Sequence, residues 1–203
     1  RMSDGEGNVA DFTFEELQAF NFGEGFEDID GNFPYQDDLV PVPSLESVIV
    51  EFPDIPLIIE IKNSGELGEQ AAAELKRLID EYGIKEHTLV ASFHDEVIAY
   101  LVGLGDGGYL VSAPEKQARK LVISTKAGLG ILHRPKTMAA QLPTESAGLN
   151  LAKKRVVKST HRHNMAIHYW TINDKDDMRT LIELGADGLI TDRPDLMKEV
   201  LAE

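Results

Sequence analysis

The sequence predicts an α/β fold built on a parallel sheet, and three features after residue 56 indicate it. Short apolar runs alternate with segments whose apolar residues recur every three or four positions, as in successive βα units. Two of the helical patterns end at glycines, Gly83 and Gly185, and glycine is the residue most common directly after a helix C-terminus. The connections between segments are short. We therefore expect six βα units in succession.

The expected elements alternate in order along the chain. The apolar runs predict strands at residues 57–62, 88–93, 109–112, 139–142, 166–171 and 188–191. The helical patterns predict helices at residues 66–82, 95–102, 115–126, 150–163, 174–184 and 194–202.

The first 56 residues have a different texture. Glycines and prolines divide them into segments too short for βα units. Thr13, with Glu16 three residues later, predicts a capped helical turn. Ser44 similarly predicts the start of a helix, 44–51, that leads into the first strand.

Charge and composition limit the classes of function. The formal net charge is −15, and the first 66 residues hold 16 acidic against 2 basic residues. Such a chain lacks the positive surface that nucleic acids require, so we expect no nucleic-acid partner. We find no apolar run long enough to span a membrane and no secretory signal pattern. The absence of cysteine excludes thiolate metal sites but leaves the compartment open, with the cytoplasm slightly favoured over a secreted or periplasmic location.

Residues 57–62, with the sequence LIIEIK, stand out because an apolar run typical of a buried strand carries two opposite charges. Alternate side chains of a strand share a face, so Ile58, Glu60 and Lys62 should lie together. Burying these charges would cost several kcal/mol unless they are paired or bound to a ligand. Two interpretations remain: a buried or rim salt bridge, or an anion or metal site at a strand end.

Seven segments in a fixed order resemble the glycerophosphodiester phosphodiesterase family. They are residues 9–17 (VADFTFEEL), 42–46 (VPSLE), 57–62 (LIIEIK), 91–93 (ASF), 141–143 (QLP), 168–173 (HYWTIN) and 185–194 (GADGLITDRP). Each segment alone is weak, since the sequence GADG before a last strand occurs in several barrel families. Their order and spacing carry the resemblance, which covers essentially the whole chain.

The resemblance implies a (β/α)8 TIM barrel with a small region inserted after its second strand. Residues 1–40 would then be part of this insertion, and residues 41–203 would be barrel units three to eight. The family's His-Arg-Gly, Glu-x-Asp and His-Asp motifs, which supply its acid–base histidines and two metal-binding carboxylates, are not recognised here. His94 and His133 do not stand where the family's histidines stand. We therefore expect a missing N-terminal segment or a partner chain to complete the barrel.

By the same resemblance, the enzyme hydrolyses a glycerophosphodiester to sn-glycerol 3-phosphate and an alcohol, using Ca²⁺ or Mg²⁺. Glu60 would be a metal ligand. Lys62 would bind the phosphate and act in catalysis by stabilising the charge that develops on the phosphoryl group. Trp170 would pack against the glycerol end of the substrate, with core packing as the alternative. Gln141, expected at the end of its strand, would bind substrate through its amide or make a structural bond to a loop.

Two other functions remain open. The chain could be a catalytically inactive phosphate-binding or interaction module that keeps Lys62 and Trp170. It could also be a barrel with lysophospholipase D-type activity, although no long apolar loop favours an acyl chain. His168, on the same face as Trp170, is expected to be a core or rim histidine whose hydrogen bonds are satisfied, rather than a ligand.

Overall fold

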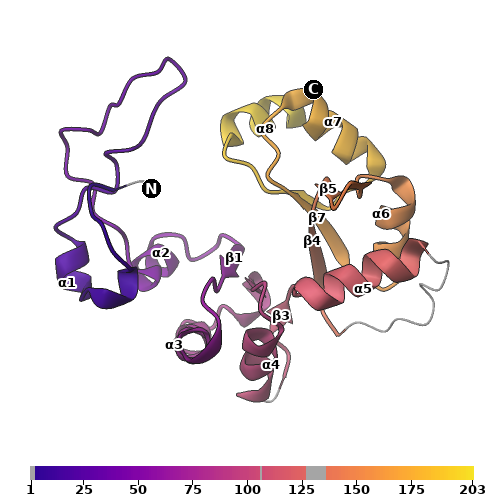
Figure 1. Ribbon diagram of the computed structural model, residues 1–203, viewed down its shortest axis with the longest axis horizontal. Helices are drawn as coiled ribbons and strands as arrows, with labels where there is room; N and C mark the ends of the chain where they lie inside the picture. The colour runs from indigo at the N-terminus through magenta and orange to yellow at the C-terminus, as the bar shows by residue number, and fades with distance from the viewer. Residues whose placement is uncertain (1–2, 106, 127–135) are drawn as a thin grey trace. The chain divides into compact units, whose positions relative to one another are not determined.

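The computed structural model describes residues 3–105, 107–126 and 136–203, which form two compact units (Figure 1). The first unit is Arg1–Asp54 and the second is Ile55–Glu203. Six parallel strands and the residues predicted to form a site all lie in the second unit. None of the described helices is long and apolar enough to cross a membrane.

The described residues of the first unit form three short helices. They are η1 (Val9–Asp11), α1 (Phe14–Leu17) and α2 (Leu45–Glu51). Two of them, α1 and α2, have N-termini capped by a side chain. The Glu16 backbone N–H donates to Thr13 Oγ1 over 3.2 Å, and the Thr13 N–H donates to the Glu16 carboxylate over 2.8 Å. The Ser47 N–H donates to Ser44 Oγ over 3.0 Å. Both predicted N-caps are confirmed.

A single buried side chain, Asn21, connects distant parts of the first unit. Its Nδ2 donates to the carbonyl oxygens of Tyr35, over 2.9 Å, and Gln36, over 3.2 Å. Its Oδ1 accepts from the backbone N–H groups of Gly23, over 2.9 Å, and Val40, over 3.1 Å. One amide therefore links three stretches of chain that have no regular secondary structure.

The described residues of the second unit form six parallel strands that follow one another in chain order. They are β1 (Leu57–Glu60), β2 (Thr88–Ala91), β3 (Leu110–Val111), β4 (Ala139–Pro143), β7 (Ala166–Trp170) and β8 (Gly188–Leu189). The pairings run β1-β2-β3 and β4-β7-β8, and a parallel bridge between Ser112 and Ala139 joins the two sets. The predicted α/β class with parallel strands is confirmed.

A helix follows each of these strands. The helices are α3 (Gly65–Glu81), α4 (Asp95–Gly103), α5 (Glu115–Lys126), α6 (Lys154–His161), α7 (Lys175–Leu184) and α8 (Pro194–Leu201), with a short turn η2 (Lys85–His87) before β2. Gly83 and Gly185 have φ angles of 65° and 91°, the left-handed conformation that glycine adopts readily after a helix. Both helix ends predicted from glycine are confirmed.

The helix predicted at residues 150–163 begins later than expected. A hairpin of β5 (Glu145–Ser146) and β6 (Leu149–Asn150) precedes it, turning at Ala147 and Gly148, which both have positive φ. Leu151 is buried, and its position fits the helical spacing of the apolar residues that follow it. Its backbone N–H nevertheless donates to Thr144 O over 2.7 Å, so it lies outside the helix. The periodicity therefore extended into the hairpin, and the predicted start at Asn150 was wrong.

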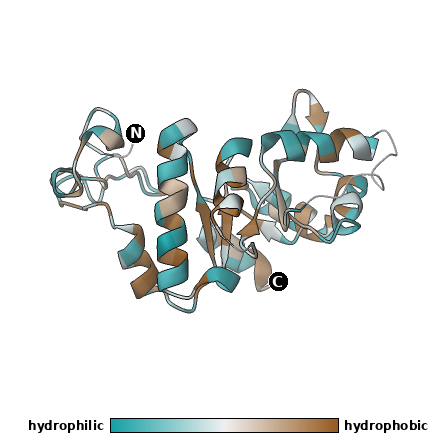
Figure 2. Cartoon of the chain, turned by 90° about the horizontal axis from the view of Figure 1, so that it is seen from below, coloured by the Kyte–Doolittle hydropathy of each residue, from teal (hydrophilic) through white to brown (hydrophobic). Residues whose placement is uncertain are grey.

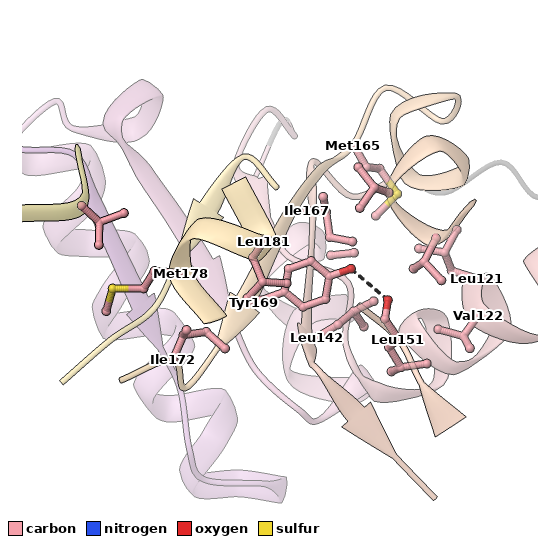
Figure 3. Close-up of a cluster of buried hydrophobic side chains, with 14 residues drawn as sticks. Leu121, Val122, Leu142, Leu151, Met165, Ile167, Tyr169, Ile172, Met178 and Leu181 are labelled. Carbon is pink, nitrogen blue, oxygen red and sulfur yellow. Dashed lines mark hydrogen bonds between the residues drawn. The ribbon is translucent and has the colours of Figure 1, made fainter. Parts of the chain in front are cut away.

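The main hydrophobic core lies between β4, β7 and the helices that cover them (Figure 3). Ile167 and Tyr169 of β7 are fully buried there, together with Ala140 and Leu142 of β4. The strands are largely hydrophobic, whereas the helices carry both hydrophilic and hydrophobic stretches (Figure 2). Because strand side chains alternate, the intervening residues of β4 and β7 face away from this core.

Tyr169 links the core to the segment after the hairpin, and its ionisation should be visible in the pH dependence of stability. Burial raises the pKa of Tyr169 to about 12, and its hydroxyl donates to Leu151 O over 2.9 Å. The folded state therefore keeps a proton that the unfolded chain loses near pH 10. The associated stability is complete below that pH and is lost as the pH rises towards 12.

We expect Tyr169→Phe to lower the free energy of unfolding at neutral pH by about 0.5–1.5 kcal/mol, through the lost hydrogen bond. Between about pH 9 and about pH 11.5, the parent should lose more stability than the variant. Urea unfolding at both pH values measures this difference. Equal losses in the two proteins would contradict the assignment.

Candidate active site

Glu60 and Lys62 form an ion pair at the carboxyl end of β1. Lys62 Nζ donates to Glu60 Oε2 over 2.6 Å, and the two side chains are 76% and 32% exposed. The strand is shorter than predicted, although the Ile61 N–H continues the ladder by donating to Ala91 O over 2.8 Å. The pairing is as the salt-bridge interpretation predicted. The pair has the rim form of that interpretation. The buried strand face that the apolar run predicted is wrong, because this face of β1 is open and Ile58 is 49% exposed.

Hydrogen bonds from the end of β2 hold the segment that carries Lys62. Ser92 Oγ donates to Ile61 O over 2.8 Å and accepts from the backbone N–H of His94 over 3.2 Å. His94 Nε2 lies 3.3 Å from Lys62 O. The backbone on both sides of the Lys62 side chain is thus tied to the neighbouring strand end. The other histidine considered, His133, lies outside the described residues.

An aromatic pair stands at the same end of the strands. The rings of Phe93, after β2, and Trp170, the last residue of β7, meet edge to face with centroids 5.9 Å apart. Phe93 is 51% exposed and Trp170 is half-buried, so the pair lies at a surface. We did not assign Phe93 to the site from the sequence. The sequence did contain a signal for it, because Phe93 is an aromatic residue two positions after Ala91. The alternation of β2, continued beyond its end, places Phe93 on the same side as Ala91.

Gln141 lies inside β4, because the strand continues to Pro143 and does not end at Gln141 as expected. Its Cα partner in the parallel ladder is His168 of β7. Gln141 Nε2 is buried, and no hydrogen-bond partner is found for it among the described residues. The alternative for Gln141 was a structural hydrogen bond to a loop. The described part of the chain shows no such bond from this amide nitrogen.

His168 is half-buried between Gln141 and Gly188, its Cα partners on β4 and β8. Burial lowers the pKa of His168, while the charge of Asp187 acts in the opposite direction. The imidazole is therefore neutral at neutral pH. This burial agrees with a core or rim position, but Nδ1 makes no hydrogen bond within the described structure, so the expectation of a satisfied histidine is wrong for that atom.

A family model now identifies the chain. The model described as the glycerophosphoryl diester phosphodiesterase family matches residues 1–196. The chain belongs to this family. Its members are phosphoric diester hydrolases with TIM-barrel folds, and the alternating strands and helices of the second unit agree with that fold.

Individual relatives and solved structures have low sequence identity to this chain. A glycerophosphodiester phosphodiesterase of Bacillus altitudinis is 25% identical over the whole chain, which spans 77% of that protein. Among solved structures, a glycerophosphoryl diester phosphodiesterase domain from Mycobacterium tuberculosis superposes with a TM-score of 0.79 at 19% identity, covering 100% of this chain and 79% of that one. A phosphodiesterase of Oleispira antarctica, solved with the product sn-glycerol-3-phosphate, gives a TM-score of 0.70 at 16% identity, with coverages of 100% and 76%. These similarities to solved structures establish the fold.

Members of the glycerophosphoryl diester phosphodiesterase family generally use a divalent cation, and the donor set of this chain can be compared with that need. Ca²⁺ takes six to eight oxygen ligands and Mg²⁺ takes six, usually including waters. Within residues 3–105, 107–126 and 136–203, no group of three or more His, Cys, Asp or Glu could hold a metal ion. The Glu60 carboxylate is a suitable oxygen donor, but the described residues alone do not form a metal centre.

Proposed function

We propose that this chain provides the phosphate- and glycerol-binding side of an active site that hydrolyses glycerophosphodiesters to sn-glycerol 3-phosphate and an alcohol. The observation that carries the proposal is the Glu60–Lys62 pair at the same strand ends as the Phe93–Trp170 pair. Barrel enzymes assemble their sites at this end of the strands. The six strands would correspond to barrel strands three to eight, with residues 1–40 as part of the insertion after strand two and residues 41–203 as the barrel units.

Lys62 is the proposed phosphate-binding and charge-stabilising residue. Its ammonium group is largely exposed, while its backbone is fixed by the contacts of Ser92 and His94. It can therefore turn from Glu60 to a phosphate oxygen without moving the strand. A fixed positive charge there stabilises the transition state, in which negative charge accumulates on the phosphoryl oxygens and the leaving group.

Glu60 is the proposed ligand of a divalent cation, Ca²⁺ or Mg²⁺, which would supply Lewis-acid stabilisation of the phosphate when bound. In the described part of the chain we assign no side chain to the general acid–base role. The proposal for Glu60 rests on its oxygen donors and its place beside Lys62.

Trp170 and Phe93 are the proposed apolar wall of the site. Their edge-to-face contact fixes both rings, and each has surface available to carbon atoms of a ligand. The glycerol carbons would pack there while Lys62 holds the phosphate. Gln141, two residues before the end of β4, would contribute a hydrogen bond to the substrate.

The full-length protein should release sn-glycerol 3-phosphate from glycerophosphocholine when Ca²⁺ or Mg²⁺ is present, and EDTA should abolish the release. In parallel, sn-glycerol 3-phosphate should change the fluorescence of Trp170, which is the single tryptophan of this sequence. A fluorescence response without hydrolysis would favour the alternative of an inactive phosphate-binding module. Absence of both would contradict the proposed site.

A further inference from the structure

Two polar side chains lie next to each other on the face of the sheet opposite to the hydrophobic core. Gln141 and His168 are Cα partners in the β4–β7 ladder, so their side chains leave neighbouring strands on the same side. The core side of these strands is occupied by Leu142 and Tyr169. Trp170 is two residues beyond His168 and therefore shares its face. Gln141 and His168 thus form a polar layer that lies two residues before Trp170 along the strands, next to the wall formed by Phe93 and Trp170.

Both side chains present a buried polar atom without a partner. Gln141 Nε2 and His168 Nδ1 are excluded from solvent, and neither makes a hydrogen bond within the described structure. An unsatisfied buried donor or acceptor costs about 1–3 kcal/mol, and such groups are uncommon in native proteins. Two of them on paired residues mark a place where a ligand hydroxyl, admitted by rotation of these side chains, would remove an energetic cost.

Gly188 determines where the imidazole lies. A Cβ atom at residue 188 would be 2.8 Å from His168 Cδ2, 3.2 Å from Cγ and 3.3 Å from Nε2. Real Cβ atoms essentially never approach so closely, so only glycine leaves room for the ring against β8. The ring atoms nearest to Gly188 do not include Nδ1, which is on the opposite edge of the ring from Cδ2. The unpartnered nitrogen is thus turned away from β8.

The chemistry of these two groups selects the ligand. The Gln141 amide is neutral, and the half-buried His168 is neutral at neutral pH because burial lowers its pKa. A desolvated pair without charge is a poor site for a phosphate oxygen, which Lys62 can bind instead. A hydroxyl group fits both atoms, because its oxygen accepts from the amide Nε2–H while its O–H donates to an unprotonated Nδ1.

We propose that Gln141 Nε2 and His168 Nδ1 together bind a neutral hydroxyl group of the substrate's glycerol, so that this pair distinguishes glycerol esters from simple alkyl esters of phosphate. The inference rests on the proposed function and adds the group that is recognised. Trp170 then contacts the carbon skeleton above the hydroxyl, and Lys62 contacts the phosphate. Gly188 is a positioning residue for His168.

Calorimetric titration with two probes tests the proposal. sn-Glycerol 3-phosphate and propyl phosphate share a phosphate and a three-carbon chain, but only the first has hydroxyl groups. We expect the parent to bind sn-glycerol 3-phosphate at least about 10-fold more tightly, the effect of about 1.4 kcal/mol from the paired hydroxyl. Gln141→Met, which removes the amide at similar volume, and Gly188→Ala, which displaces the His168 ring, should both lose the preference while still binding propyl phosphate.

Gln70→Met is the matched control, because Gln70 is an exposed α3 residue whose amide contacts Glu66. It should keep the preference of the parent. A second measurement needs no altered binding site: the ¹⁵N resonance of His168 Nδ1 in the parent should shift with sn-glycerol 3-phosphate and not with propyl phosphate. The resonance is assigned by its absence in His168→Gln.

The outcomes separate this inference from the function on which it rests. Equal binding of the two probes by the parent, or an unchanged preference in Gln141→Met, overturns the hydroxyl site and leaves the phosphate site intact. An Nδ1 resonance that responds to neither probe, although both bind, indicates that the glycerol hydroxyl does not reach this pair and also overturns it. Failure of the parent to bind either probe overturns the proposed function itself.

Discussion

We expect Lys62→Met to lower kcat for glycerophosphodiester hydrolysis by about 10²–10³-fold in the full-length protein, the loss typical of removing one group that stabilises transition-state charge. Methionine keeps the aliphatic length of the side chain and removes the ammonium group. Lys62 is 76% exposed, so its replacement should not disturb folding. Steady-state kinetics with glycerophosphocholine measures the change, and unchanged cooperative unfolding confirms that the fold is retained.

Lys158→Met is the matched control for this substitution. Lys158 is an exposed residue of α6 and is outside the proposed site, so its loss should leave kcat within about two-fold of the parent. Glu60→Gln is the companion variant, because it keeps the side-chain shape and removes the proposed ligand charge. If Lys62→Met and Glu60→Gln both hydrolyse substrate within a few-fold of the parent, the roles assigned to this pair are wrong.

The second large effect is expected at Gly68, where α3 passes close to the segment that carries Lys62. A Cβ atom on Gly68 would lie 2.4 Å from the backbone oxygen of Asn63 and 2.6 Å from Val97 Cγ2 of α4. The first neighbour is backbone and cannot rotate away, so the helix or the segment must move. We expect Gly68→Ala to lower the free energy of unfolding by about 1–3 kcal/mol, as overpacking does.

Gly103→Ala is the control for backbone effects of the same substitution. Gly103 is the last residue of α4, and among the described residues, apart from its chain neighbours and the backbone of its own helix, no atom lies within 4 Å of a Cβ built on it. Alanine there should be neutral or stabilising by up to about 1 kcal/mol. Urea unfolding of the two variants measures the contrast. Equal stability of Gly68→Ala and the parent would show that α3 accommodates the methyl group and would contradict the close packing.

The alternation of strands and helices could be predicted because it depends on local sequence. The N-caps at Thr13 and Ser44 and the glycines after α3 and α7 are each encoded within a few residues. The pairing of Glu60 with Lys62 could also be predicted, because residues two positions apart in a strand lie on the same face.

The remaining features of the site depend on contacts between residues far apart in the sequence. Phe93 meets Trp170 only because β2 and β7 end at the same side of the sheet, and local periodicity holds no record of that contact. The register that places Gln141 beside His168 is likewise a property of the ladder. The exposure of Ile58 was missed because apolar composition predicts burial but does not say what covers a strand face.

The described part of the first unit has few fully buried side chains. Among the described residues of this unit, only Asn21, Gly23 and Ile49 are buried, and the aromatic pairs Phe12–Phe20 and Phe26–Tyr35 keep part of their surface in water, so folding removes little apolar surface from water. Heat capacity and denaturant sensitivity both scale with the surface that unfolding exposes, and apolar exposure dominates the first. Opening of this unit should therefore depend only weakly on temperature and urea.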